Sequence, residues 1–170
     1  MRLAPLLALA GLVLALSGCA GYRLGPSNGE RAGARSLQIT PFANKTPEPR
    51  LIEAITASLR KSVQQDGTYR LGTDGASDII VSGDIVKFER EYLSFQPRDV
   101  VTPRDYRLAI VSHVTARERL SGKILLDRDV RGHSTIRTGV DLNSAERQAI
   151  PLVAEDLARN ITALLVDGTW

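Results

Sequence analysis

The stretch DIIVSGDIV, residues 78–86, decides the fold of this chain. Its side chains alternate, so that one face would carry Ile79, Val81, Gly83 and Ile85 and the other Ile80, Ser82, Asp84 and Val86. A repeat of two residues is typical of a β-strand, whose successive side chains point to opposite faces. We therefore expect a long strand that starts at Asp78 and continues to Phe95.

Two further strands are predicted after the first. Residues 96–104 contain two prolines and several charges, which indicates a connection, and the next strand should run from Tyr106 to Arg119 with one face made by Leu108, Ile110, Ser112 and Val114. Residues 120–123, LSGK, form a predicted tight turn, and a third strand then runs from Ile124 toward Ile136. Because short connections join antiparallel neighbours, the three strands should form an antiparallel meander.

The segment before the meander predicts one short strand and one helix. In residues 36–42, Leu37, Ile39 and Pro41 alternate with Gln38, Thr40 and Phe42, as in a strand. A helix should follow with Thr46 as its cap and Pro47 at its first position, because its apolar residues recur every three to four positions, at Leu51, Ile52, Ile55, Leu59 and Val63. Gly67 should end this helix in a left-handed conformation, and residues 69–71 should form a brief extended piece.

The C-terminal segment predicts a second helix. Residues 143–146, NSAE, have the form of a capping box, and the apolar residues that follow should bury one face of a helix kinked at Pro151. The order is strand, helix, three-strand meander, helix. We therefore predict an α+β fold, a two-layer sandwich in which two helices pack on one face of a mixed or antiparallel four-stranded sheet.

The first twenty residues predict export. A single charge at Arg2 is followed by the apolar run 3–16, which is too short to span a bilayer and which lacks stop-transfer charges, as in a signal peptide. Residues 16–19, LSGC, resemble the lipobox of bacterial lipoproteins, which implies cleavage before Cys19 and lipid attachment to its thiol. Ala20 in place of aspartate then implies sorting to the outer membrane. An ordinary secretory signal with a free or buried cysteine is the alternative.

These features predict three regions: a cleaved signal peptide (1–18), a lipidated N-terminus and tether (19–35) and one periplasmic domain (36–170). The tether is rich in Gly, Ser, Asn and Pro. Cys19 is the only cysteine, so no disulfide can form within the chain. Loss of Arg2 leaves 21 basic against 19 acidic residues, a balance that does not point to nucleic acid as a partner.

The chain offers little material for catalysis or metal binding. Its two histidines, His113 and His133, have no cysteine to join them in a zinc site once Cys19 is acylated. No phosphate-binding glycine loop and no nucleophile elbow is present. We therefore expect no enzyme activity, no metal and no cofactor, and we interpret both histidines as satisfied or exposed strand residues.

Several segments together resemble one family of bacterial lipoproteins. They are residues 19–22, CAGY, 41–46, PFANKT, 66–71, DGTYRL, 76–78, ASD, 83–85, GDI, 106–108, YRL, 121–125, SGKIL, 145–147, AER, and the terminal Trp170. The pattern is similar to the lipopolysaccharide-assembly lipoprotein family LptE and covers nearly the whole mature chain. The resemblance implies a non-enzymatic protein on the periplasmic side of the outer membrane, which plugs the β-barrel LptD, helps the barrel assemble and contacts lipopolysaccharide.

Four arginines are candidates for that lipid contact. In a meander, the connection between the first two long strands lies at the same end as the exit of the third, so Arg98, Arg104 and Arg107 should lie near Arg137. Arginine binds phosphate groups bidentately, and lipid A carries phosphates. The alternative is a solvated loop end without a ligand.

Two other functions remain open from the sequence. A lipoprotein activator of a penicillin-binding protein, which would regulate peptidoglycan synthesis, also shows a strand, an Asn-x-Thr turn, a helix and a Gly-x-Ile strand. The long C-terminal helix and the short tether favour the first family, because reaching the cell wall from the outer membrane usually requires a longer linker. The third possibility is a lipoprotein that shares only the fold.

Overall fold

The computed structural model describes residues 31–73, 75–96, 99–137 and 142–167. The elements follow the order β1 (Arg35–Ile39), β2 (Ala43–Asn44), α2 (Leu51–Asp66), β3 (Tyr69–Leu71), β4 (Ile79–Gln96), β5 (Asp99–Glu118), β6 (Ile124–Arg137) and α3 (Leu142–Asp167). The predicted α+β class is therefore confirmed. Cys19, the signal peptide and most of the tether lie outside the described residues, as does Arg98.

The sheet is mixed and has six strands, where four were predicted. Its order is β3-β1-β4-β5-β6, with β2 also paired to β4. The meander β4-β5-β6 is antiparallel as predicted, whereas β1 pairs in parallel with both β3 and β4, and β2 pairs in parallel with β4. The prediction missed β2, and it gave residues 69–71 only as a brief extended piece outside the sheet, where the structure has β3. The two strands are only two and three residues long, and such short segments show no alternation of their own.

Helix α2 starts later than predicted. It begins at Leu51, and Arg50 precedes it without a side-chain cap bond. Thr46, the expected cap, instead donates both its backbone N–H and its hydroxyl to Oδ1 of Asn44, at 2.9 and 2.8 Å. Pro49 disfavours helical backbone at the residue before it, so the helix cannot extend back through Glu48. The C-terminal end is as predicted, since Gly67 has φ 76° and donates its N–H to the carbonyl of Val63.

Phe42 is buried, which corrects its predicted place opposite Leu37 and Ile39. Strand β1 ends at Ile39, so the alternation does not carry on to Phe42, which is 2% exposed while Pro41 is exposed. The ring lies against Gly83 of β4, where a built Cβ would come within 2.5 Å of Phe42 Cε1. Glycine at position 83 therefore makes the space that the Phe42 ring occupies.

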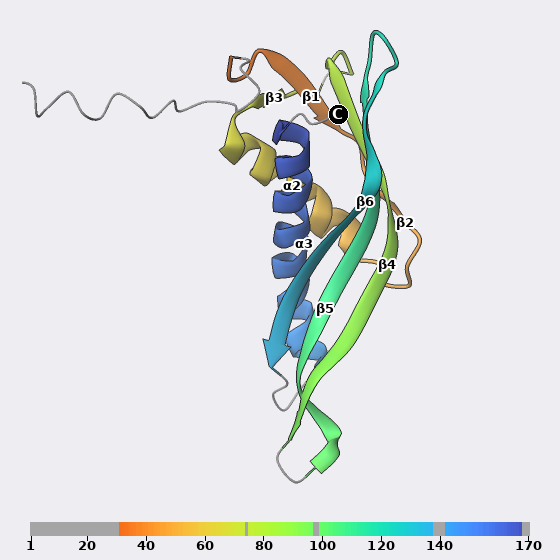
Figure 1. The fold of residues 1–170 in the computed structure, drawn as a ribbon, viewed down its shortest axis with the longest axis vertical. Helices are drawn as coiled ribbons and strands as arrows, with labels where there is room; N and C mark the ends of the chain where they lie inside the picture. The colour runs from red at the N-terminus through yellow and green to blue at the C-terminus, as the bar shows by residue number, and fades with distance from the viewer. Residues whose placement is uncertain (1–30, 74, 97–98, 138–141, 168–170) are drawn as a thin grey trace, which may run out of the picture.

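Both helices lie on the same side of the sheet (Figure 1). The apolar stripe of α2 is buried at Leu51, Ile55, Leu59 and Val63, as predicted. The buried residues of β5 include the predicted set of Leu108, Ile110, Ser112 and Val114. Helix α3 continues through Pro151 and buries Val153, Leu157, Ile161 and Leu165. These side chains form one continuous core between the helices and the sheet.

Helix α3 packs closely on β6 and protects its edge. A Cβ built at Gly132 would lie 2.4 Å from the backbone nitrogen of Leu157, so the two backbones meet here. On either side, Asp156 accepts the N–H of His133 at 2.9 Å, and Asn160 donates to the carbonyl of Arg131 at 2.8 Å. Two side chains of α3 thus satisfy backbone groups that an edge strand would otherwise expose.

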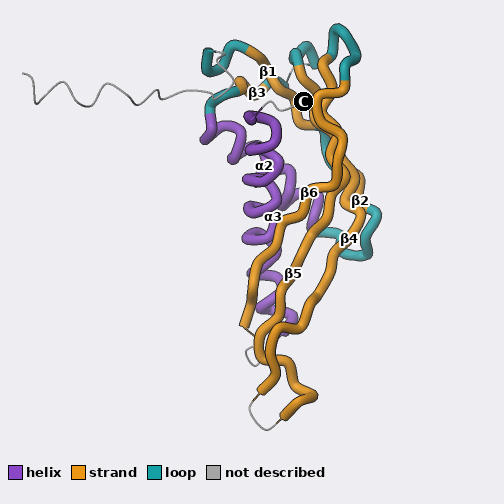
Figure 2. Tube along the Cα trace, viewed as in Figure 1, coloured by secondary structure: helices purple, strands orange, loops and turns teal. Residues whose placement is uncertain are grey.

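The hairpin of β4 and β5 extends beyond the helices (Figure 2). Its far end lies at the opposite end of the molecule from β1, where the described chain begins (Figure 1). Strand β4 has 18 residues, which at about 3.3 Å per residue is a length of roughly 60 Å. The fold therefore places the N-terminal end of the domain and the end of this hairpin far apart.

Candidate functional site

We call the sheet face that is turned away from α2 and α3 the open face. On β5 the residues between the buried ones point to it, among them Asp105, Arg107, Val111, His113 and Thr115. Their register partners share the same face, so that Arg107 lies between Glu91 and Thr135, and Val111 between Lys87 and Arg131. The open face is thus a polar surface made by the three long strands.

The carboxylate of Asp105 is the centre of the arginine end, which we define as Arg104, Arg107 and Arg137. Asp105 pairs in register with Arg137 and accepts a hydrogen bond from its Nε at 3.0 Å, while Nε of Arg104 lies 4.0 Å from the same carboxylate. Ser94 donates its hydroxyl to Asp105 at 2.7 Å. The bond from Ser94, followed by that from Arg137, lowers the pKa of Asp105. Asp105 therefore stays ionised and holds two arginines of different strands together.

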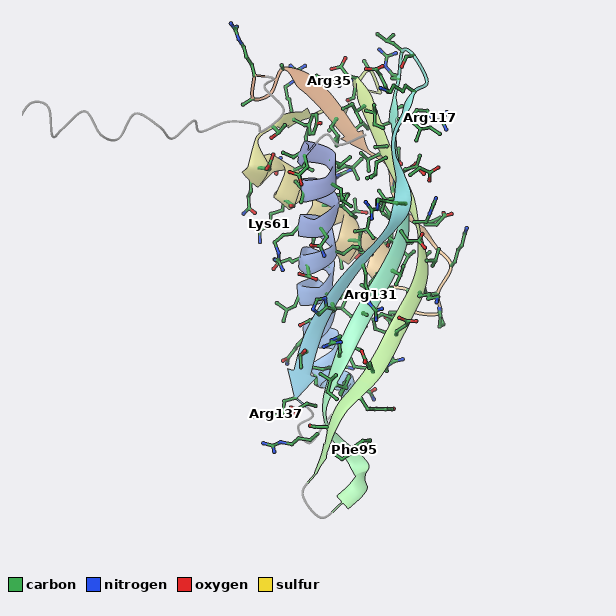
Figure 3. All side chains as sticks on the ribbon, viewed as in Figure 1. Arg35, Lys61, Phe95, Arg117, Arg131 and Arg137 are labelled. Carbon is green, nitrogen blue, oxygen red and sulfur yellow. The ribbon has the colours of Figure 1, made fainter. Side chains whose placement is uncertain are left out.

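Arg107 lies on the same face of β5 as Asp105, two residues further along the strand. Its Nη1 donates to Oε2 of Glu91 on β4 at 3.1 Å. The structure thus brings Arg104, Arg107 and Arg137 to one end of the sheet, each with a carboxylate nearby. Arg137 is 71% exposed at its side chain, and it points outward at that end (Figure 3). The guanidinium groups are oriented by carboxylates and remain accessible to an anion.

Arg90 belongs to the helix side of the hairpin. It forms a bidentate pair with Glu146 of α3, with Nε and Nη2 at 2.5 and 2.9 Å from the carboxylate oxygens. Its guanidinium also lies 5.1 Å from the centre of the Phe88 ring. Burial, and next the charge of Glu146, raises the pKa of the nearby Tyr106 to about 12. Glu146, predicted as part of a capping box, thus joins α3 to the hairpin.

His113 lies between two carboxylates in the middle of the open face. Nδ1 is 2.9 Å from Asp129 and Nε2 is 2.8 Å from Asp127, both on β6. The hydrogen bond with Asp129 is the main cause that raises the pKa of His113. Both ring nitrogens can bond to carboxylates only when both carry protons, and such a ring has no lone pair for a metal. His113 thus links β5 to β6 when its ring is protonated.

Replacing Asp129 with asparagine should lower the pKa of His113 toward the 6.5 of a free imidazole, because the main bond to the charged ring is lost. The check is an NMR titration of the His113 ring in the wild type and in Asp129→Asn. Since folding raises this pKa, the stability that the contact contributes is complete below pH 6.5 and is lost as the pH rises through the raised value. An unchanged titration midpoint in Asp129→Asn would contradict the assignment.

Three large apolar side chains are exposed near the end of the β4–β5 hairpin. Tyr92, Leu93 and Phe95 are 60%, 41% and 46% exposed, and we call them the apolar tip. The rings of Tyr92 and Phe95 lie 6.4 Å apart, and Phe95 is seen at the same end as Arg137 in Figure 3. The alternation of residues predicted their place in the strand but not their exposure. The signal was an apolar run at the very end of a strand, beside a segment rich in proline and charge.

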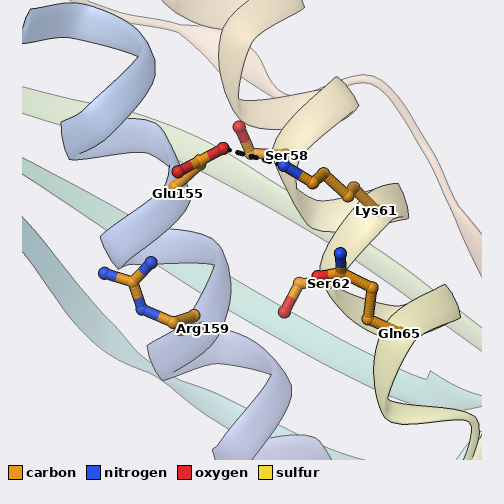
Figure 4. Close-up of a pocket in the computed structure, with 6 residues that line it drawn as sticks. All are labelled: Ser58, Lys61, Ser62, Gln65, Glu155 and Arg159. Atoms are coloured by element: carbon orange, nitrogen blue, oxygen red, sulfur yellow. Dashed lines mark hydrogen bonds and ion pairs between the residues drawn. The ribbon is translucent and has the colours of Figure 1, made fainter.

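The groove between the two helices is too small for a lipid. It is lined by Ser58, Lys61, Ser62, Gln65, Glu155 and Arg159, and Lys61 spans it to reach Glu155 at 3.1 Å (Figure 4). Its volume of about 90 Å³ is well below the roughly 300 Å³ at which small-molecule pockets begin. This groove is therefore not a candidate site for a lipid.

The described residues were also examined for metal-binding clusters and for helices that could span a membrane. Across the described ranges, no cluster of three or more His, Cys, Asp or Glu side chains is arranged to hold a metal ion. In the same part of the chain, neither helix combines the length and the hydropathy that crossing a bilayer requires.

Comparison with known proteins identifies one family. The family model for lipopolysaccharide assembly, LptE, matches residues 34–165, which include every strand and nearly all of α3. No curated protein sequence matches the chain.

Solved structures are similar in fold at low sequence identity. A Xanthomonas campestris protein of the DUF330 family has a TM-score of 0.62 at 10% identity, over 86% of this chain and 91% of that chain. A hypothetical protein from Chlamydia trachomatis has 0.54 at 8%, over 77% and 95%. A minor lipoprotein from Acinetobacter baumannii has 0.52 at 15%, over 78% and 92%. These likenesses support the fold.

Proposed function

This chain belongs to the lipopolysaccharide-assembly family LptE, and from that premise we propose that it is a non-catalytic outer-membrane lipoprotein that plugs the β-barrel LptD, assists its assembly and contacts lipopolysaccharide. The observation that carries the proposal is the family match over residues 34–165. The proposal includes the processing predicted from the N-terminus, with residues 1–18 removed, Cys19 acylated and residues 19–35 acting as a tether to the folded domain.

The open face suits a position inside a barrel. The lumen of a transmembrane β-barrel is polar, so a protein within it needs a polar surface. The side chains of Lys87, Glu89 and Arg131 form a chain of ion pairs on this face, at 3.8 and 3.4 Å. On such a surface the positive and negative charges largely balance. Its exposed ion pairs are weak, so these side chains can instead form contacts with the polar inner wall of a barrel.

The arginine end supports contact with the phosphates of lipopolysaccharide. Arg104, Arg107 and Arg137 lie at one end of the sheet beside two carboxylates, Asp105 and Glu91. A phosphate group could bridge two of these guanidinium groups, because each presents several donors in one plane. We propose these three residues, with Arg98, as the lipopolysaccharide contacts.

A mild-detergent pull-down of the tagged, lipidated protein from its native outer membrane tests the proposal. The expected result is one large β-barrel protein in stoichiometric amount. A Cys19→Ser variant should lose the lipid and leave the membrane fraction, which serves as the control for anchoring. Recovery of a bifunctional penicillin-binding protein instead would assign the chain to the regulation of peptidoglycan synthesis, and recovery of no specific partner would overturn the barrel proposal.

The same pull-down tests the arginines separately. In a variant with Ser at positions 98, 104, 107 and 137, the barrel should still be recovered, but the lipopolysaccharide that comes with it should fall by about tenfold, because several charge-assisted bonds are lost together. Arg117→Ser with Arg119→Ser, at the other end of the sheet, is the matched control. Equal amounts of lipopolysaccharide in both variants would remove the arginine end from the proposal.

A further inference from the structure

We infer that the β5–β6 turn, residues 119–123, docks on the lipid leaflet that holds the acyl chains of Cys19, with Leu120 in the acyl boundary and Lys123 at the phosphate head groups. The inference rests on the acylation of Cys19 proposed above and adds a second membrane contact to it. It does not depend on a barrel partner, and it concerns the end of the sheet opposite to the arginine end.

Leu120 is the most exposed large apolar side chain in the described part of the chain, at 82%. The turn does not need this leucine, because other residues close it. Gly122 has φ 70° and donates its N–H to the carbonyl of Glu118, and the hydroxyl of Ser121 accepts the N–H of Lys123 at 3.1 Å. A single exposed leucine is common on protein surfaces, so it is the setting of Leu120 that gives it meaning.

The turn lies at the end of the domain that is joined to the anchor. Arg31, the first described residue, comes twelve positions after Cys19, and twelve residues span at most about 40 Å. Arg35, the first residue of β1, forms an ion pair with Glu118 at 2.5 Å, directly before the turn. Figure 3 shows Arg35 at the end of the molecule opposite to Arg137. The anchor therefore keeps the turn within reach of the leaflet, whereas the far end of β4 lies roughly 60 Å away.

The charge around the turn fits an anionic lipid surface. Residues 117–124 carry three cations and one carboxylate, Glu118, which is paired with Arg35. The neighbouring carboxylate, Asp78, accepts both the backbone N–H and the hydroxyl of Ser36, at 2.8 and 2.7 Å, and is thereby bound within the domain. Lys123 is exposed and has no ion-pair partner in the described part of the chain. The excess positive charge is therefore available to lipid phosphates.

Ile124 adds a second exposed apolar side chain to the same end, at 46%. It pairs in register with Arg117 and so lies on the same face of the sheet as that cation. Apolar side chains that enter the acyl boundary beside cations that reach the head groups are typical of interfacial segments. Together with an acyl chain, a basic patch is the usual second signal for holding a protein on a membrane.

Tryptophan fluorescence of the lipidated full chain in vesicles tests the inference. Trp170 is the only tryptophan, so Trp170→Phe with Leu120→Trp places a single tryptophan in the turn and keeps that position apolar. The vesicles contain equal phosphatidylglycerol and phosphatidylcholine, with acyl chains brominated near the head group to quench tryptophan on contact. The expected result is a blue shift and strong quenching at position 120. The matched control is Trp170→Phe with Leu93→Trp, an exposed leucine at the other end of the sheet, which should stay unquenched.

A second variant tests the role of charge. Adding Lys123→Ser to the protein with tryptophan at position 120 should lower the ratio of quenched to unquenched protein by about fivefold, because one cation near an anionic leaflet is lost. In vesicles of phosphatidylcholine alone the same substitution should have little effect. Lys61→Ser is the matched control, since Lys61 is an exposed lysine on α2, and it should change the quenching in neither kind of vesicle.

The intact mass of the purified protein is measured first, because it shows whether Cys19 carries acyl chains. A mass without them would overturn both the proposed processing and this inference. With acylated protein, three results overturn the inference alone: no quenching at position 120, equal quenching at positions 120 and 93, or shielding of position 120 only when a purified barrel protein is present. The last would make the turn a protein contact.

Circular dichroism of each variant checks the fold, which should be retained because the substituted leucines and lysines are exposed. The pull-down described above identifies the barrel partner and does not depend on the turn. A failure of the vesicle experiment with acylated protein therefore leaves the barrel proposal unaffected, and the two proposals can fail separately.

Discussion

Replacing Phe42 with alanine should lower the free energy of unfolding by about 3 to 5 kcal/mol, the range for removing a buried aromatic ring. The ring is 2% exposed and fills the space above Gly83. The neighbouring backbone is held by the pairing of β2 with β4, at Ala43 with Asp84 and Asn44 with Ile85, so the site cannot easily collapse around the cavity. Urea denaturation of the detergent-solubilised protein measures the change.

Pro41→Ala is the matched control for this substitution, because Pro41 is the exposed neighbour and should change stability little. A second variant tests the contact directly. A Cβ at position 83 would meet Phe42 Cε1 at 2.5 Å and the carbonyl of His113 at 2.8 Å. Gly83→Ala should therefore be less damaging in the Phe42→Ala background than alone, and full additivity of the two changes would contradict the contact.

Replacing Gly132 with alanine should lower the free energy of unfolding by about 3 kcal/mol, at the upper end for overpacking. The added Cβ would lie 2.4 Å from the backbone nitrogen, 2.5 Å from Cβ and 2.6 Å from Cα of Leu157. None of these atoms is the end of a flexible side chain, so α3 must move away from β6. That movement would also lengthen the bonds from Asp156 and Asn160 to the β6 backbone.

Thr135→Ala is the control for Gly132→Ala, since Thr135 is exposed on the same strand. Hydrogen exchange adds a local readout, because the amide of His133 should lose protection in the glycine variant when its acceptor Asp156 moves. A stability equal to that of Thr135→Ala, with unchanged exchange at His133, would show that the helix and the strand are not in backbone contact.

The arginine end shows how a sequence can locate a site without describing it. The meander topology places Arg104, Arg107 and Arg137 at one end of the sheet because the connection of the first two strands and the exit of the third share that end. The sequence did not predict that the Asp105 carboxylate contacts both Arg104 and Arg137. Its role depends on which face it shares with Arg137 and on the hydroxyl of Ser94, eleven residues away in sequence.

The patterns that the sequence determined by itself are local ones. The alternation in β4, β5 and β6, the apolar repeat of α2 and the left-handed Gly67 all follow from the spacing of residues along one element, and the structure confirms them. The apolar run and the LSGC motif, from which lipidation of Cys19 is predicted, are also local patterns, and they lie outside the described residues. Each depends on neighbours within about one turn or a few strand positions, so the spacing of residues along one element is enough to predict it.

Only the tertiary structure decided the features that depend on distant partners. Strands β2 and β3 exist because β4 and β1 offer them open edges, and Phe42 is buried because Gly83 leaves room for its ring. The two carboxylates that hold His113 lie fourteen and sixteen residues away from it. The apolar tip is exposed because the β4–β5 hairpin extends past the ends of the helices that cover the rest of the sheet (Figure 2). Burial and pairing are properties of the assembled layers, and residue spacing alone does not specify them.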